Sequence, residues 1–318
     1  MTPSLVVIGS ANMDLVVRSA HIAAPGETVL GEAFRQIPGG KGANQAVAAA
    51  RLGAAVTFVG RVGNDLFGEA LRSGMQADSI DTTYLQTDPT EPTGVALIGV
   101  DAQGQNAITV ASGANFQVSA QDIDQALPII RRASAILLQL EIPRETVLYA
   151  TQQAHDAGIP VILNPAPASL TDPLPDSLLA QIDVLTPNEY EASALLGLEY
   201  QPESDWAAIA NLLLTKGVKA VVITLGEDGC LVADSTGSQH IPAIAVNAVD
   251  TTAAGDCFTG ALSVALAEGR SLEEAAQFAA QAAAISVTRS GAQPSLPTRS
   301  EVDASSVTTS RLTPMPSK

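Results

Sequence analysis

Short apolar runs separated by helical stretches dominate the middle of the chain. Four such runs have the length of a strand: residues 135–140, 161–163, 182–185 and 220–224. Residues 5–9 and 55–59, near the N-terminus, have the same character. Apolar strands that alternate with helices are typical of a parallel sheet with both faces covered. The pattern therefore predicts an α/β fold: a central, mostly parallel sheet with helices on both faces, in three layers.

Several helix boundaries are also visible in the pattern. The alanine-rich segment 42–52 predicts a helix that ends at Gly53. Asp65 is a suitable N-terminal cap for the next helix, which runs through Leu71. Residues 254–267 predict a helix near the C-terminus, and Ser271-Leu-Glu-Glu274 is a capping box that begins another, to about residue 287.

Two separated segments differ from this alternation. Residues 94–100 and 106–110 are apolar and flank a turn-like sequence, Asp101-Ala-Gln-Gly104, which predicts a hairpin. Residues 15–17 continue a second strand after a polar break. We expect these segments, about 12–37 and 92–112, to form a small β-sheet that acts as a lid.

The remaining organisation is simple. We expect residues 1–299 to form one α/β domain together with its lid. The Ser/Thr-rich segment 300–318 has no apolar periodicity and is expected to be a disordered tail.

Composition and charge exclude several classes of function. The 318 residues include 16 Lys and Arg and 33 Asp and Glu, a net charge of −17. An acidic surface repels phosphate backbones and anionic lipids, so nucleic acid and membranes are not expected partners. Cys230 and Cys257 are too few for a disulfide framework or a four-ligand zinc site. Because no signal peptide or membrane-spanning pattern is visible, we expect a soluble, cytoplasmic protein.

Residues 38–44, Pro-Gly-Gly-Lys-Gly-Ala-Asn, form a glycine-dense segment directly before a predicted helix. Gly42 follows Lys41 where a Walker A phosphate loop requires Ser or Thr, so this segment is not such a loop. One interpretation is a tight turn with positive φ. We favour another, in which the glycines let a polar ligand approach the backbone while Lys41 and Asn44 donate hydrogen bonds.

Residues 250–256, Asp-Thr-Thr-Ala-Ala-Gly-Asp, follow a strand-like segment, 241–249, and open a helix. Free N–H groups and the helix dipole attract anions at such a position. Asp256 in the first turn is also an ordinary capping residue. However, the small side chains of residues 253–255 leave the amides uncovered. A carboxylate beside an anion hole suits phosphoryl transfer to a hydroxyl, because it can accept the proton while the amides stabilise the phosphate.

Other polar residues follow predicted strands, at the edge where open α/β sheets bind ligands. Asn12, Asp14 and Glu141 are in such positions. Asn188 and Glu191 begin the helix after strand 182–185; first-turn acids are ordinary, but this spacing also lets them orient magnesium-bound water. The sequence 224–229, which ends a strand with two glycines, is in isolation a simple turn.

Together these segments resemble the ribokinase-like family of carbohydrate kinases, over about residues 4–298. Segment 39–44 resembles that family's N-terminal signature, and segment 250–256 resembles its C-terminal one. Further similarities lie in residues 9–14, 139–141, 164–168 and 289–295. Gly40-Lys-Gly42 is similar to the members that act on ribose, whereas fructokinases and adenosine kinases usually have Gly-Gly-Ala there.

The resemblance implies ATP-dependent phosphorylation of D-ribose at its 5-hydroxyl. It implies that Asp256 is the general base and that Ala253, Ala254 and Gly255 form the anion hole. The residues implied to hold ribose are Asn12, Met13, Asp14, Gly40, Lys41, Gly42, Ala43, Asn44, Glu141 and Asp256. Those implied to bind ATP are Asn188, Thr224, Leu225, Gly226, Glu227, Asp228, Gly229 and Gly255.

The same resemblance implies two metal ions and a partner. Glu191 would assist Mg²⁺ through water, and K⁺ would act as an activator. The residues implied to hold this monovalent cation, mostly through backbone carbonyls, are Asp250, Thr252, Ser286, Arg289, Gly291 and Ser295. Members of the family commonly dimerise through their lids, which implies a homodimer. Ala280 stands near the adenine where relatives often have His or Asn, and no role is assigned to it.

Three other interpretations compete with this one. The chain could be another sugar or nucleoside kinase, such as a deoxyribokinase or a fructokinase. It could be a non-catalytic sugar-binding sensor, although the presence of Asp256 argues against that. A Rossmann dehydrogenase is disfavoured because no Gly-x-Gly-x-x-Gly follows a strand.

Overall fold

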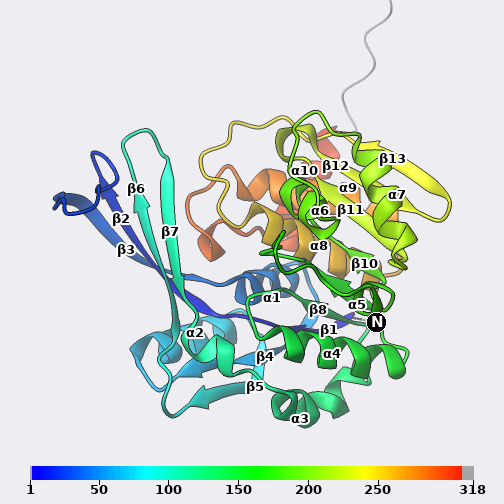
Figure 1. The fold of residues 1–318 in the computed structure, drawn as a ribbon, viewed down its shortest axis with the longest axis horizontal. Coiled ribbons are helices and arrows are strands. Elements are labelled where there is room, and N and C mark those ends of the chain that lie inside the picture. Colours follow the sequence, from blue (N-terminus) through cyan, green and yellow to red (C-terminus); the bar gives the residue numbers. More distant parts are fainter. Residues whose placement is uncertain (1, 310–318) are drawn as a thin grey trace, which may run out of the picture.

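Figure 1 shows the computed structural model, in which a large α/β body carries a small separate sheet on one side. The structure describes residues 2–309. The large sheet has the strand order β13-β12-β11-β10-β9-β8-β1-β4-β5, parallel except for the antiparallel pairs at β12 and β13. Its strands are β1 (Ser4–Ile8), β4 (Ala55–Gly63), β5 (Asp81–Asp88), β8 (Ala135–Leu138), β9 (Val161–Leu163), β10 (Val184–Leu185), β11 (Ala220–Thr224), β12 (Cys230–Asp234) and β13 (Gly237–Ile241). The predicted three-layer α/β fold with a small separate sheet is confirmed.

Helices cover both faces of the large sheet, because alternate residues of its central strands point to opposite sides. Leu5 and Val7 of β1 pack into one core, whereas Val6 and Ile8 pack into the other. The helices on the first side are α1 (Lys41–Arg51), α2 (Leu66–Ala77), α8 (Ala254–Ala267), α9 (Leu272–Ser286) and α10 (Arg299–Thr309). Those on the second side are α3 (Ala120–Ile130), α4 (Arg144–Asp156), α5 (Asp176–Leu179), α6 (Glu189–Leu195) and α7 (Trp206–Thr215).

The small sheet has the order β3-β2-β6-β7. Its strands are β2 (Asn12–Ser19), β3 (Gly31–Gly39), β6 (Gly94–Val100) and β7 (Asn106–Ala111). Strands β6 and β7 are antiparallel neighbours joined at Asp101, whose N–H bonds to Gln105 O at 2.9 Å, so the predicted hairpin is confirmed. The far ends of these strands project away from the body (Figure 1).

The predicted helix boundaries are also confirmed at several places. Gly40 and Gly53 have φ values of +86° and +102° and flank α1. The Asp65 carboxylate accepts a hydrogen bond from Gly68 N at 2.8 Å, and Ser271 with Glu274 forms the capping box of α9. Among the described residues, no helix has the length and apolarity needed to span a bilayer.

Two expectations near the C-terminus were wrong. Of the strand-like segment 241–249, only Ile241 lies in a strand; Val249 N and Asp250 N instead bond to Val287 O on the neighbouring α9 segment. Residues 299–309 are not disordered, because they form α10, which buries Val302. The rest of the expected tail, 310–318, lies outside the described residues.

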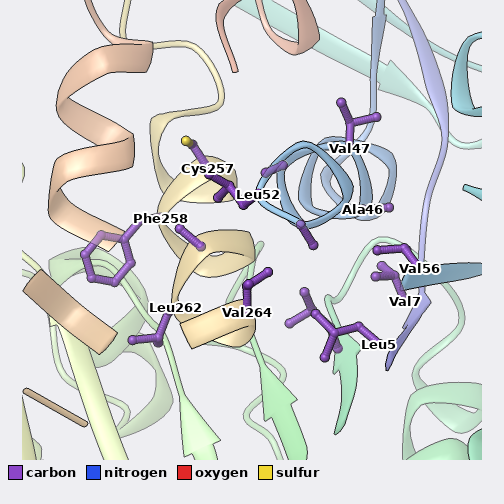
Figure 2. Packing of buried hydrophobic residues seen from close by; sticks show 14 of the residues in the cluster. Leu5, Val7, Ala46, Val47, Leu52, Val56, Cys257, Phe258, Leu262 and Val264 are labelled. Atoms are coloured by element: carbon purple, nitrogen blue, oxygen red, sulfur yellow. The ribbon is translucent and has the colours of Figure 1, made fainter. Parts of the chain in front are cut away.

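Helices α1 and α8 pack closely across one core (Figure 2). Ala46 and Val47 of α1 belong to the same buried cluster as residues of β1 and α8. The two helices come closest at Gly260, where an added Cβ would lie 2.8 Å from Ala48 Cβ and 2.8 Å from Gln45 O. Since Gln45 O is backbone, any larger side chain at Gly260 must push the helices apart.

We therefore expect Gly260→Ala to lower the free energy of unfolding by about 1–3 kcal/mol, the usual cost of an overpacked core. The matched control is Gly74→Ala in α2, where an added Cβ meets nothing within 4 Å. The control should be more stable than the wild type by about 0.4–1 kcal/mol, because alanine restricts the unfolded chain. Urea unfolding measures both, and a Gly260→Ala protein as stable as the wild type would contradict the close packing of α1 and α8.

Candidate active site

Two adjoining cavities lie beside the N-terminus of α8. One, of about 610 Å³, lies between the small sheet and the body and is lined by residues that include Asp14 and Asp250. The other, of about 560 Å³, is lined by Thr224, Gly255 and an apolar set. Ala248 and Thr251 line both cavities, so the segment before α8 lies at their junction.

Asp256 lies in the first turn of α8 and is buried. Its Oδ2 accepts a hydrogen bond from Asn44 Nδ2 at 2.9 Å, and its Oδ1 accepts one from Gln45 Nε2 at 3.0 Å. The structure thus brings Asp256 and Asn44 together, as the sequence predicted. Gln45 was missed because it was treated as one more residue of a helix-forming run. A single glutamine in an alanine-rich helix gives no signal that its amide bonds to a carboxylate 211 positions away.

Glu141 follows β8 and faces the N-terminus of α1. Its Oε2 accepts hydrogen bonds from Ser10 Oγ at 2.6 Å and from Lys41 N at 3.2 Å. The backbone amide at the start of a helix therefore holds this carboxylate, which also benefits from the helix dipole. Ser10 was not singled out from the sequence.

Asn12 and Asp14 begin β2, the strand that leads from the body into the small sheet. Asn115 Nδ2 donates to Asn12 Oδ1 at 2.7 Å, and Ala11 N donates to Asn115 Oδ1 at 2.9 Å. Asn115 was also missed from the sequence. It follows β7, the last strand of the small sheet, and its bond to Asn12 connects the end of that sheet to the start of β2. The Asp14 carboxylate lies directly over Gly39, where an added Cβ would collide with it.

Some implied sugar-binding residues can act only through their backbone. The Met13 and Ala43 side chains are buried in the core on the α1 side of the large sheet, away from the cavities. Gly40 and Gly42 have no side chain, and an added Cβ would lie 2.7 Å from Asn12 N and from Ser10 N, respectively. Glycine is therefore required at these two positions because the backbone before β2 approaches them closely. From the sequence alone, this requirement cannot be distinguished from the close approach of a ligand.

The charged groups of this region strongly influence one another. Burial raises the pKa of Asp14 to about 7, and the nearby carboxylates of Glu141 and Asp256 add to this effect. Burial by itself would lower the pKa of Lys41, but Asp256, Glu141 and Glu191 outweigh it and raise that pKa. Lys41 is therefore held as a cation among carboxylates, where it can attract an anionic group.

The N-terminus of α8 provides free amide groups. Ala253 precedes the helix in the left-handed conformation, with φ = 59°, which is rare for a residue other than glycine. The first helical hydrogen bond runs from Cys257 N to Ala253 O at 2.8 Å, so the N–H groups of Gly255 and Asp256 have no acceptor within the helix. An added Cβ at Gly255 would meet nothing within 4 Å, so space for a phosphate lies above it. The anion hole at Ala253, Ala254 and Gly255 stays a prediction, and the free amides at the start of α8 are compatible with it.

The second cavity is lined by five of the eight implied nucleotide-binding residues. Its lining includes Thr224, Gly226, Glu227, Gly229 and Gly255. Leu225 and Asp228 are not part of this lining; Leu225 packs into the core on the α7 side instead. Asn188 is the N-terminal cap of α6 and pairs with Thr224 in a parallel β-bridge, which brings these two residues together.

The rest of the second cavity is apolar, and apart from Ala280 its lining residues were not predicted. Its lining residues are Ala243, Ile244, Ala245, Val246, Phe258, Ala280, Ala283, Ala284 and Val287. These residues come from the irregular segment after β13 and from α8 and α9. A sequence pattern gives no signal for them, because an alanine that lines a pocket looks like an alanine in a core.

A magnesium ion would find only a partial protein site here. Glu191 is buried, and its Oε2 accepts a hydrogen bond from Asn188 N at 2.9 Å in the capping box of α6. Burial raises the pKa of Glu191, although the Asn188 bond and Lys41 oppose this shift. Among residues 2–309 there is no group of three or more His, Cys, Asp or Glu that could hold a metal. Such a site fits Mg²⁺ that arrives on phosphates and keeps most of its water.

The residues implied to bind a monovalent cation converge beside the anion hole. The Asp250 carboxylate accepts hydrogen bonds from Thr252 N at 2.9 Å and from Gly291 N at 2.8 Å. Burial would raise the pKa of Asp250, but the bonds from Thr252 and Gly291 lower it, so the group is held ionised. Ser295 bonds to Ala292 O, and the Ser286 carbonyl accepts from Arg289 N. A fixed negative charge beside a carbonyl-rich turn fits a weakly hydrated cation.

The raised pKa of Asp14 generates a test. In the unfolded chain Asp14 ionises near its ordinary pKa of 3.8, whereas in the folded protein it ionises near 7. Its favourable contribution is therefore present at low pH and is lost as the pH rises through about 7. Asp14→Asn cannot ionise, so the variant should gain stability relative to the wild type by about 1–3 kcal/mol between about pH 5 and about pH 8. Thermal unfolding at both values measures this gain, and a difference that does not change with pH would contradict it.

Comparison with known proteins extends the likeness beyond single motifs. The profile of the pfkB family carbohydrate kinases matches residues 2–299. A ribokinase from Haemophilus influenzae is 44% identical over 301 residues, which cover 95% of this chain and 97% of that protein. A deoxyribokinase from Salmonella typhimurium is 39% identical over 293 residues, covering 92% and 95% of the two chains.

Solved structures agree with the sequence relatives. A ribokinase from Arabidopsis thaliana, solved in complex with ribose and ATP, aligns with a TM-score of 0.88 and 37% identity. The alignment covers 96% of this chain and 98% of that one. A ribokinase from Thermotoga maritima aligns with a TM-score of 0.86 and 40% identity, over 96% and 99% of the chains. With a profile match over nearly its whole length and relatives this similar, the chain belongs to the pfkB family of carbohydrate kinases.

Proposed function

We propose that this protein transfers the γ-phosphoryl group of ATP to the 5-hydroxyl of D-ribose, giving ribose 5-phosphate and ADP. The observation that carries the proposal is the position of Asp256. Its carboxylate lies close enough to Asp14 to add to the raised pKa of that group, and Gly255, whose amide is free at the start of α8, lines the second cavity. The relatives named as ribokinases, and the one solved with ribose and ATP, support the same reaction.

Each group has one task in this proposal. The ribose 5-hydroxyl loses its proton to Asp256 as its oxygen bonds to the γ-phosphorus, and the bond from that phosphorus to the β-phosphate oxygen breaks to release ADP. The amides of Gly255 and Asp256 stabilise charge on the transferring group, and Lys41 adds a positive charge nearby. When bound with the nucleotide, Mg²⁺ would neutralise phosphate charge, with Glu191 holding one of its waters.

The proposed sugar site lies at Asp14, which lines the larger cavity, and at the carboxylates of Glu141 and Asp256 that influence its pKa. Asp14 and Glu141 would accept hydrogen bonds from ring hydroxyls, and Asn44 would donate one while it also holds Asp256. The small sheet lies over this cavity and would shield the reaction from water, so that phosphate passes to the sugar. This sheet is therefore the proposed lid.

A deoxyribokinase is the second candidate, because a protein of that name is 39% identical to the chain. The two activities differ in whether the site reads the 2-hydroxyl. A site that does so rejects the analogue lacking this group by a large factor. ADP formation with ribose, 2-deoxyribose, fructose and adenosine should be fastest at low concentration with ribose. A higher kcat/KM with 2-deoxyribose would favour the second candidate, and no sugar-dependent ADP formation would refute the kinase itself.

Removal of the base tests the mechanism. Asp256→Asn should lower kcat by about 10²–10⁴-fold, the usual effect of losing a general base. Folding should be retained, because Asn44 Oδ1 has no partner among the described residues and its amide can turn to accept from the new side chain. Calorimetry should still detect ribose binding. If Asp256 were only a helix cap, kcat would change little and only stability would fall.

We also propose that K⁺ activates the enzyme through the turn formed by Asp250, Thr252, Ser286, Arg289, Gly291 and Ser295. The support is the hydrogen bond from Gly291 N to Asp250, which joins this turn to the segment that precedes the anion hole. A cation bound there would fix the segment that carries Ala253 and Gly255.

Activity should accordingly be several-fold higher in K⁺ than in Na⁺ or in a bulky organic cation, at equal ionic strength. Asp250→Asn removes the fixed negative charge and should reduce this difference. Equal rates of the wild type in all three cations would count against the site.

Two further proposals concern assembly and compartment. Val17, Phe34 and Leu97 share the face of the lid sheet opposite Asp14 and are 40, 57 and 53% exposed, so two lids could bury them in a homodimer. The buried free thiols of Cys230 and Cys257 and the use of ATP suit the reducing cytoplasm, where we place the protein.

A further inference from the structure

Three buried amide side chains form a row behind Asp256. They are Gln45 in α1, Gln139 directly after β8, and Asn164 directly after β9. Gln139 Nε2 donates to Gln45 Oε1 at 2.6 Å, and Gln45 Nε2 donates both to Asp256 Oδ1 at 3.0 Å and to Asn164 Oδ1 at 3.1 Å. None of the three is among the residues assigned above to sugar, nucleotide or metal.

The contact between Asn164 and the Thr186 carbonyl fixes which group donates and which accepts in every hydrogen bond of this row. Asn164 Nδ2 lies 2.7 Å from the backbone carbonyl of Thr186, which can only accept. Asn164 Oδ1 must therefore face Gln45 and accept from it. The Gln45 NH₂ group then points to both Asn164 and Asp256, and its carbonyl is left to accept from Gln139. The amide of Gln45 has only one orientation that satisfies all its neighbours.

We propose that Gln45 is a positioning residue for phosphoryl transfer, oriented in turn by Gln139. The proposal rests on the proposed function of Asp256 as the base. Gln45 fixes Oδ1 of that carboxylate and Asn44 fixes Oδ2, so the plane of the carboxylate is set relative to the sugar hydroxyl. Gln139 prevents the Gln45 amide from turning its carbonyl toward Asp256, which would repel the carboxylate.

The packing around the row argues against a purely structural role. Gln139 Oε1 is buried and has no hydrogen-bond partner among the described residues, which an apolar side chain of similar size would avoid. Gly9 leaves the space that this amide occupies, since an added Cβ there would collide with Gln139 Oε1. Position 139 thus carries an amide even though its oxygen, Oε1, has no hydrogen-bond partner among the described residues.

The experiment compares Gln45→Met, Gln139→Met and the double variant, with Thr151→Val as the matched control. Methionine keeps the length of glutamine without its hydrogen bonds. Thr151 lies on α4 and also has a buried hydroxyl with no partner among the described residues, so its replacement tests the loss of a buried polar group on the opposite side of the large sheet from α1. Steady-state kinetics with ribose and ATP are combined with calorimetry of ribose binding and with urea unfolding.

We expect kcat to fall about 10–100-fold in Gln45→Met and about 3–10-fold in Gln139→Met, because a mispositioned base loses part of the effect of a general base. The KM and the dissociation constant for ribose should stay within about threefold, since neither residue touches the sugar. The double variant should be no slower than Gln45→Met within about twofold, because Gln139 acts through Gln45. Thr151→Val should retain the wild-type kcat.

Several results would overturn the proposal. One is a folded Gln45→Met protein with kcat within twofold of the wild type. Another is a double variant whose loss of kcat equals the product of the two single losses. A third is a variant in which kcat and the affinity for ribose fall by the same factor. If Gln45→Met does not fold, Gln139→Met decides, and a wild-type kcat in that variant overturns the proposal. If the wild-type protein forms no ADP with any sugar, the proposed function and this inference both fail. If the wild type is active and only the variants differ from expectation, this inference fails alone.

Discussion

Burial of the Asp256 carboxylate close to other carboxylates is the constraint on which the rest of the site depends. A charge taken out of water loses solvation, and its negative neighbours Asp14, Glu141 and Glu191 add repulsion. The fold offsets this cost with Lys41, with the amide donors on α1 and with helix N-termini. The close packing of α1 against α8 is therefore a requirement of the chemistry as well as of stability.

The architecture was predictable wherever local pattern and tertiary structure agree. Strands buried on both faces must be continuously apolar, and helix α8 has the bounds that its residues predict. Segment 242–249 is apolar but does not form a strand. Several of its apolar residues line a cavity, and the N–H group of its last residue, Val249, bonds to Val287 O at the end of α9. Helix α10 was missed because it depends on tertiary contacts, such as the Arg289–Glu301 ion pair and the burial of Val302.

The site was predictable where a residue type is unusual for its position. A lysine among glycines and an aspartate after small residues were enough to locate Lys41 and Asp256. Gln45 and Asn115 could not be found in this way, because their roles arise from partners more than 100 positions away along the chain. Asn188 and Glu191 fit both a capping role and a role in the site. They form the capping box of α6, and the same arrangement leaves the buried Glu191 carboxylate beside the site.

The carboxylate of Asp256 and the amide of Asn44 are separated by 212 positions in the chain. During synthesis, Asn44 of the proposed sugar site therefore emerges long before Asp256, the proposed base. The N-terminal segments must therefore reach their places with an incomplete set of charges, and the last large helices complete both the core and the site. Loss of the C-terminal third would thus remove the proposed base and the packing partner of α1 in one event.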